Sequence, residues 1–107
     1  MEQDSTIEPT ALVEMLKREE KLMLLDCREP WEYEAARLEG STLIPMREIP
    51  RSLDRIPRDQ PVVVYCHAGR RSQQVADWLR EQGVDAHSLS GGIERWALEI
   101  DPKVPRY

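Results

Sequence analysis

The chain has 107 residues, 40% of them hydrophobic and 33% charged, which is typical of one globular domain rather than of a disordered segment. Its formal net charge of −5 argues against nucleic acid as a partner, because phosphate contacts need a basic face. No apolar run approaches the roughly 20 residues of a membrane span, and the acidic residues 1–4 lack the apolar stretch of a signal peptide. We therefore expect a cytoplasmic protein without a membrane partner.

Short apolar runs alternate with segments of helical periodicity along the chain. In chain order, the pattern predicts a helix at 10–17, a strand at 22–25, a helix at 31–38, a strand at 41–44, a helical turn at 52–56, a strand at 61–65, a helix at 72–82, a strand at 84–89 and a helix at 93–99. The strand at 61–65 is β-branched, and Gly83 follows the 72–82 helix as a C-cap. Such alternation predicts an α/β fold, with a parallel sheet covered by helices on both faces. We expect the three tryptophans to pack against this sheet.

The segment 66–72, Cys-His-Ala-Gly-Arg-Arg-Ser, joins the clearest strand to the clearest helix, where open parallel sheets bind ligands. Gly69 permits a tight turn that gathers backbone N–H groups, the helix N-terminus adds positive potential, and Arg70 and Arg71 add full charges. These features favour the thiolate form of Cys66 and would hold an anion such as thiosulfate, a persulfide or a phosphate at its sulfur. A cysteine can also be a small buried core residue, but this setting favours a nucleophile.

The order of Cys66, Gly69, Arg71 and Ser72 resembles the active-site loop of the rhodanese family of sulfurtransferases. Two further stretches are similar to the family's flanking signatures. These are Asp-Cys-Arg-Glu-Pro-Trp-Glu-Tyr at 26–33, followed by Gly40 and Ile44-Pro45, and Leu-Ser-Gly-Gly-Ile-Glu-Arg-Trp at 89–96. The resemblance implies a rhodanese-like three-layer α/β/α domain with a mainly parallel sheet of about five strands. We expect a single domain over 1–107, with a core at about 7–98 and a C-terminal tail at 99–107.

The resemblance also implies a role for each matching residue. Cys66 would take sulfane sulfur from thiosulfate or a persulfide donor and pass it, as a persulfide, to a thiol, cyanide or a protein acceptor. The backbone N–H groups of the loop would hold the anionic sulfur, and the loop residues are His67, Ala68, Gly69, Arg70, Arg71 and Ser72. Both arginines would attract the donor, and Ser72 would cap the helix. A buttressing cluster is expected from Asp26, Arg28 and Glu32. We expect a monomer with no metal and no organic cofactor.

Two other functions remain open. The domain could be a sulfur-carrier module that serves a partner enzyme, because residues 97–107 resemble rhodanese domains attached to enzymes that activate sulfur-carrier proteins. It could also be a phosphatase or arsenate reductase of related fold. Those enzymes place five residues between the cysteine and the arginine, whereas Arg71 comes one position earlier here, so the loop length argues against them.

Two departures from the family pattern leave further questions. Cys27 stands where an aliphatic residue is usual, which favours a core side chain. The alternative is a resolving thiol that closes a disulfide with Cys66, provided that their Cα atoms lie within about 7 Å. Arg37 stands in place of a usual histidine, and we interpret it as a solvated surface residue rather than as part of the site.

Overall fold

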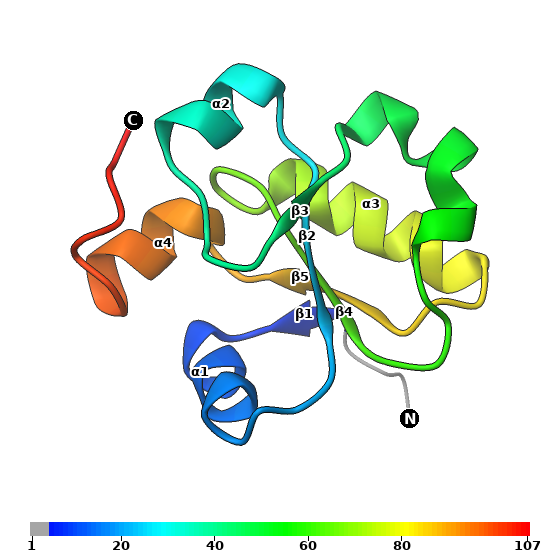
Figure 1. Cartoon of the computed structure of the whole chain (residues 1–107), viewed down its shortest axis with the longest axis horizontal. Coiled ribbons are helices and arrows are strands. Elements are labelled where there is room, and N and C mark those ends of the chain that lie inside the picture. The colour runs from blue at the N-terminus through cyan, green and yellow to red at the C-terminus, as the bar shows by residue number, and fades with distance from the viewer. Residues whose placement is uncertain (1–4) are drawn as a thin grey trace.

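A sheet of five parallel strands, in the order β1-β5-β4-β2-β3, forms the centre of the molecule (Figure 1). The computed structural model describes residues 5–107, so the expectation drawn from residues 1–4 lies outside the described residues. The elements are β1 (Thr6–Ile7), α1 (Pro9–Lys17), β2 (Met23–Asp26), α2 (Pro30–Ala35), β3 (Thr42–Leu43), the 3-10 helices η1 (Met46–Glu48) and η2 (Pro50–Arg55), β4 (Val62–Tyr65), α3 (Arg70–Glu81), β5 (Ala86–Leu89) and α4 (Gly92–Glu99). This arrangement confirms the predicted α/β fold class.

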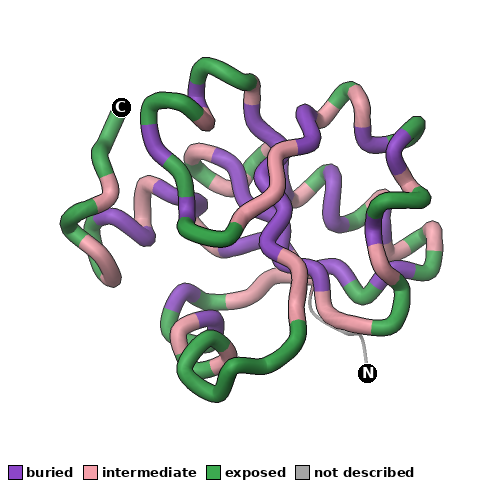
Figure 2. The backbone as a smooth tube through the Cα atoms, in the orientation of Figure 1, coloured by how far each residue is buried: buried purple, intermediate pink, exposed green. Residues whose placement is uncertain are grey.

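The strands separate two apolar layers because their side chains alternate between the faces of the sheet. In β4, Val62 and Val64 point into one layer, while Val63 and Tyr65 point into the other. The first layer is completed by α3 and the 3-10 helices, and the second by α1 and α4. Figure 2 shows the resulting distribution, with a buried sheet at the centre and exposed turns at the periphery. The sheet therefore has helical layers on both faces, as predicted.

One strand that was not predicted and one predicted helix that ends early each have a local cause. The sequence pattern did not indicate β1, because its two residues are too few to show a period, yet Thr6 pairs with Ser88 at the edge of the sheet. The helix predicted at 31–38 ends at Ala35. The chain then becomes extended at Ala36, and the Leu38 N–H donates to the Tyr65 hydroxyl at 3.1 Å instead of continuing the helix.

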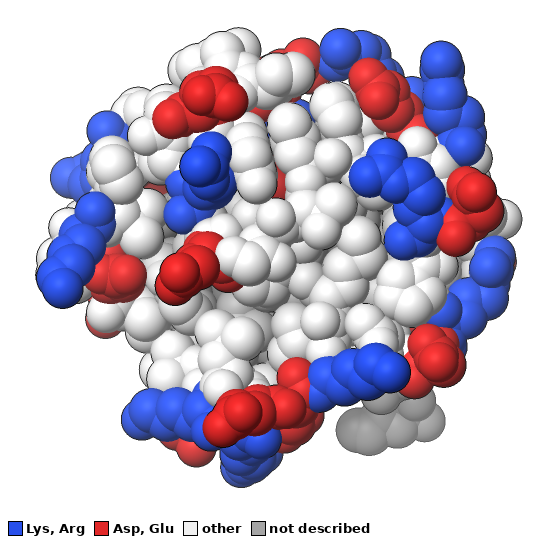
Figure 3. Space-filling view, viewed as in Figure 1, with Lys and Arg blue, Asp and Glu red and all other residues white. Residues whose placement is uncertain are grey.

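The surface carries charges of both signs. On the face in Figure 3, basic and acidic side chains are intermixed around the periphery of the described part, and the centre is largely uncharged. Within residues 5–107, no helix has both the length and the apolar character needed to cross a membrane.

Candidate active site

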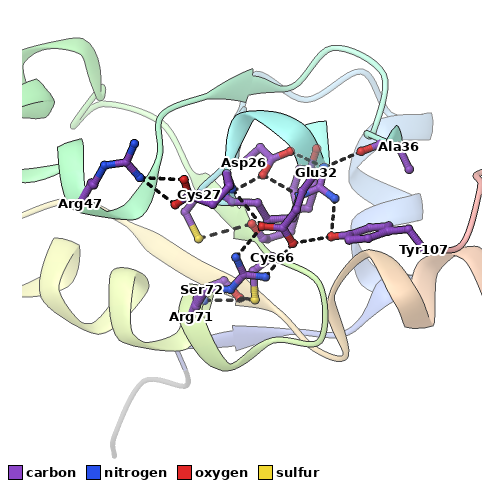
Figure 4. A network of polar contacts seen from close by, with 12 residues as sticks. Asp26, Cys27, Glu32, Ala36, Arg47, Cys66, Arg71, Ser72 and Tyr107 are labelled. Carbon is purple, nitrogen blue, oxygen red and sulfur yellow. Dashed lines mark hydrogen bonds and ion pairs between the residues drawn. The ribbon is translucent and has the colours of Figure 1, made fainter. Parts of the chain in front are cut away.

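Cys66 directly follows β4, and the loop after it curls around the cysteine sulfur (Figure 4). The residue is 1% exposed. Its Sγ accepts hydrogen bonds from the backbone N–H of Gly69 at 3.1 Å and of Ser72 at 3.4 Å. Gly69 has a φ of +105°, a conformation that favours glycine and that turns the loop back toward the sulfur. Backbone donors aimed at a sulfur stabilise negative charge there, so the loop suits a thiolate nucleophile.

The N-terminus of α4 holds the same loop from behind. The Ile93 N–H donates to the Cys66 carbonyl at 2.9 Å, and the Glu94 N–H donates to the His67 carbonyl at 3.0 Å. This close approach depends on Gly92, which has a φ of +62° and where a Cβ atom would lie 2.6 Å from the Cys66 carbonyl oxygen. The Gly91-Gly92 turn therefore supports the loop.

Ser72 does not cap α3, which corrects the sequence-based expectation. The helix begins at Arg70 with Gly69 as its N-cap, so that Ser72 lies in the first turn. Its hydroxyl contacts the Cys66 Sγ at 3.4 Å and the Ser88 hydroxyl at 2.7 Å, and it donates to the Gly69 carbonyl at 3.3 Å. The side chain thus belongs to the buried polar lining beneath the cysteine sulfur.

Arg71 is held by Glu32, and the two side chains form a bidentate ion pair with distances of 2.8 and 3.0 Å. Glu32 also accepts the Glu29 N–H at 3.0 Å and the Tyr107 hydroxyl at 2.8 Å, as Figure 4 shows for Tyr107. Burial alone would raise the pKa of Glu32, but these donors outweigh it and lower that pKa to about 2. The charge of Arg71 is therefore largely balanced inside the protein.

A second ion pair lies deeper, between Asp26 and Arg28, both with side chains that are completely buried. The Arg28 Nε and Nη2 donate to the two carboxylate oxygens of Asp26 at 2.9 and 2.6 Å, and its Nη1 donates to the Tyr107 hydroxyl at 2.7 Å. Tyr107 thus joins this pair to Glu32. The three residues expected to form a buttressing cluster do lie together, and they connect the sheet to the Cys66 loop through Arg71.

Tyr107 is a residue that the sequence pattern did not indicate. The tail folds back so that the Tyr107 ring packs edge-on against His67, with centroids 4.6 Å apart, and against Trp31 at 5.7 Å. Because this contact joins segments remote in the chain, no local spacing could have revealed it. Trp31 is 64% exposed, so the expectation that it packs against the sheet was wrong. The Nδ1 of His67 is buried and has no hydrogen-bond partner among residues 5–107.

Arg70 is the loop cation that faces solvent. It is exposed, and it makes no ion pair with the part of the chain that the structure describes. It lines a cavity of about 450 Å³ together with Ala68, Gly69 and Gln73. Arg37 is also exposed, and its guanidinium lies over the Tyr33 ring, 4.6 Å from the centroid. Arg70, rather than Arg37, is therefore the exposed arginine that an anion entering this cavity would meet.

Cys27 is 1% exposed and packs in the same apolar layer as Cys66. Both cysteines are free thiols in this structure. The Cys27 Sγ donates to the Tyr65 carbonyl at 3.5 Å, and burial raises the pKa of its thiol, with a further rise from the nearby Cys66 and Asp26. The core position expected for Cys27 is what the structure shows. No group of His, Cys, Asp and Glu side chains among residues 5–107 is arranged to hold a metal ion.

Comparison with known proteins identifies the family. The model of the rhodanese-like domain matches residues 8–99. The chain is 36% identical over 106 residues to the probable adenylyltransferase/sulfurtransferase MoeZ of Mycobacterium tuberculosis, covering 96% of this chain but 27% of that protein. It is 33% identical over 97 residues to the putative sulfurtransferase YtwF of Bacillus subtilis, covering 91% of this chain and 94% of that one. A third relative, the chloroplastic rhodanese-like/PpiC domain-containing protein 12 of Arabidopsis thaliana, is 36% identical over 93 residues, which are 82% of this chain and 31% of that protein.

Solved structures agree with this assignment. A rhodanese-like domain protein from Staphylococcus aureus superposes with a TM-score of 0.84 at 25% identity, covering 96% of this chain and 98% of that chain. A Rhodopseudomonas palustris protein described as a possible tyrosine phosphatase has a TM-score of 0.78 at 20% identity, covering 97% and 85%, which shows the shared fold alone. With a family model that spans most of its length and relatives named sulfurtransferases, the chain belongs to the rhodanese family, and these relatives support a role in sulfur transfer.

Proposed function

We propose that this protein is a thiosulfate sulfurtransferase in which Cys66 carries the sulfur as a persulfide. The donor is thiosulfate or a persulfide, and the acceptor is a thiol, cyanide or a protein. The observation that carries the proposal is the contact of two backbone N–H groups, from Gly69 and Ser72, with the Cys66 Sγ. Donors fixed in this way stabilise a sulfur anion without reorganising during the reaction.

The chemistry has two displacement steps at sulfur. The Cys66 thiolate attacks the outer sulfur of thiosulfate, the sulfur–sulfur bond of the donor breaks, and sulfite leaves with the electron pair. The acceptor nucleophile then attacks the outer sulfur of the Cys66 persulfide and releases the thiolate again, so that cyanide yields thiocyanate. Arg70 attracts the anionic donor, and loop N–H groups of residues 67–72 hold the negative charge of the outer sulfur.

Phosphatase chemistry is less well supported. The arginine of the loop comes one position early for a phosphatase pattern, and that residue, Arg71, has both of its terminal nitrogens engaged by Glu32. It is therefore not free to form the bidentate contact with a phosphate that arginine makes best. The arsenate reductase alternative is less well supported for the same reason.

A carrier role is the second candidate, and the match to MoeZ favours it, because that match extends over 106 residues, more of the chain than the family model spans. In this role the Cys66 persulfide is supplied by a protein donor and consumed by a partner enzyme. We also propose that the domain core lies within about residues 7–98 and that the protein is cytoplasmic. We further propose that it is a monomer, and light scattering on the purified chain would test this.

The decisive experiment measures thiocyanate formed from thiosulfate and cyanide by the wild type and by Cys66→Ser. A rate in the wild type that disappears in the variant supports the proposal, provided that both proteins give the same circular dichroism spectrum. Equal rates in the two proteins refute it. A negligible rate in both, with transfer restored when a persulfide-bearing protein is the donor, selects the carrier function. An aryl phosphate assayed in parallel detects phosphatase activity dependent on Cys66.

A further inference from the structure

Cys27 and Cys66 lie opposite each other at the carboxyl ends of two neighbouring parallel strands. In the register of β2 with β4, Leu25 pairs with Val64 and Asp26 pairs with Tyr65, which makes the two cysteines the next facing positions. The strands are still joined there, since the Cys27 N–H donates to the Tyr65 carbonyl at 3.2 Å. Parallel strands lie about 4.8 Å apart, within the range of about 4.4–6.8 Å between the Cα atoms of a disulfide.

The two side chains also share one face of the sheet. Successive residues of a strand alternate between faces, and the paired residues Leu25 and Val64 both belong to the apolar layer beneath α3. Two positions further along each strand, Cys27 and Cys66 belong to that same layer, whereas Tyr65 belongs to the opposite one. Both side chains therefore lie on the same face of the sheet, and each cysteine is only 1% exposed.

We propose that Cys27 is a resolving thiol for the Cys66 persulfide, an inference that rests on the proposed function of Cys66. The Cys27 Sγ attacks the inner sulfur of the persulfide, a Cys27–Cys66 disulfide forms, and the bond to the outer sulfur breaks. The outer sulfur leaves as HS⁻, taking the electron pair and the proton of Cys27, so that atoms and charge balance. A dithiol reductant then returns both cysteines to thiols. The protein would thus release sulfide when no acceptor takes the sulfur.

The surroundings of Cys27 explain why it stays inactive until Cys66 is loaded. Burial raises the pKa of the Cys27 thiol, and the negative charge of Cys66 and Asp26 raises it further, while Arg71 opposes them. Persulfide formation moves the negative charge of Cys66 outward to the outer sulfur, away from Cys27. The product disulfide is uncharged and therefore suits two buried side chains better than two sulfur anions would.

The test uses the reduced full chain and two variants, Cys27→Val and Cys27→Ala, the second serving if the first does not fold. Thiosulfate is added without an acceptor, and the reaction is stopped in denaturant that contains maleimide, which labels free thiols. The mass of the protein is then measured by mass spectrometry, and the free sulfide in solution is assayed separately. The wild type should release one sulfide per chain, become lighter by two hydrogens and take up no maleimide, with a peptide map joining Cys27 to Cys66. The variants should retain the outer sulfur. A wild type that keeps its outer sulfur as long as the variants do overturns the proposal.

A second arm separates this inference from the proposed function. Hydrogen peroxide oxidises a thiolate to a sulfenic acid, which condenses with a neighbouring thiol to a disulfide and water. If no persulfide forms in any of the proteins, sulfur transfer from thiosulfate is what fails, and the peroxide arm still decides whether the pair closes. A disulfide in the wild type supports the facing arrangement. Addition of two oxygens at Cys66, with Cys27 still reactive toward maleimide, refutes it.

Discussion

The ion pair between Glu32 and Arg71 allows the loss of stability on replacement of Glu32 to be predicted. Replacement of Glu32 by glutamine keeps the shape of the side chain but removes the charge that Arg71, the Glu29 N–H and the Tyr107 hydroxyl all contact. Burial opposes ionisation of Glu32, yet these partners lower its pKa from 4.5 to about 2. A shift of that size corresponds to about 3 kcal/mol of stability in favour of the charged native state.

The sign of the pH dependence follows from the direction of this shift. A carboxylate with a lowered pKa in the folded state stabilises the protein fully above its unfolded pKa, and that contribution is lost as the pH falls through the folded value. Glu32→Gln should therefore cost about 3 kcal/mol at neutral pH. The difference from the wild type should shrink between about pH 4.5 and pH 2, the window that the two pKa values define.

Guanidinium chloride unfolding, followed by tryptophan fluorescence at several pH values, measures this difference. A matched control is Glu99→Gln, because Glu99 pairs with Arg95 on the surface and its side chain is 51% exposed. Such an exposed pair contributes little to stability, so the control should unfold nearly as the wild type does. A Glu32→Gln penalty that is the same at pH 7 and at pH 3, or no larger than that of the control, would refute this reasoning.

Three further changes can be tested in the same way. Gly92→Ala should destabilise the protein by about 3 kcal/mol in thermal unfolding, because the new Cβ would meet the loop carbonyls. Gly40→Ala should cost about 1 kcal/mol, because the space around Gly40 is open and only the strain of its positive φ remains. Tyr107→Phe should cost about 1–2 kcal/mol of stability, because it leaves the buried groups of Arg28 and Glu32 without the Tyr107 hydroxyl. Tyr33→Phe should cost less, because the Tyr33 hydroxyl donates a hydrogen bond of 3.3 Å. Equal effects of the two changes would contradict the linking role of Tyr107. Arg70→Ala should raise the KM for thiosulfate roughly threefold to tenfold with kcat little changed, and high salt should narrow the gap; a KM that stays unchanged would remove Arg70 from donor binding.

The parts of the fold that local patterns specify were predictable from the sequence. The β-branched run of β4 and the apolar face of α3 each carry a period of their own, and the loop between them combines a cysteine, a glycine and two arginines in a spacing that indicates its chemistry. These features depend on residues that are neighbours in the chain, which is why the sequence suffices for them.

What could not be predicted depends on contacts between distant segments. The two-residue strand β1 exists because β5 offers it a pairing edge, and Trp31 is exposed because α2 projects it beside the tail rather than toward the sheet. The ion pair that engages Arg71 comes from Glu32, 39 positions away, and Tyr107 reaches Glu32 across 75 positions. Such contacts cannot be derived from the composition of the chain or from the periodicity of its segments.

The contact of α4 with the Cys66 loop has a consequence for how the loop would meet an anion. In a planar trans peptide unit the C=O and the N–H point in opposite directions. Because the carbonyls of Cys66 and His67 are held by the Ile93 and Glu94 amides, the N–H groups of the next residue in each peptide unit are turned away from the helix. The backbone orientation of the loop is thus set by a helix that need not touch the substrate, and the donors are in place before any charged sulfur arrives.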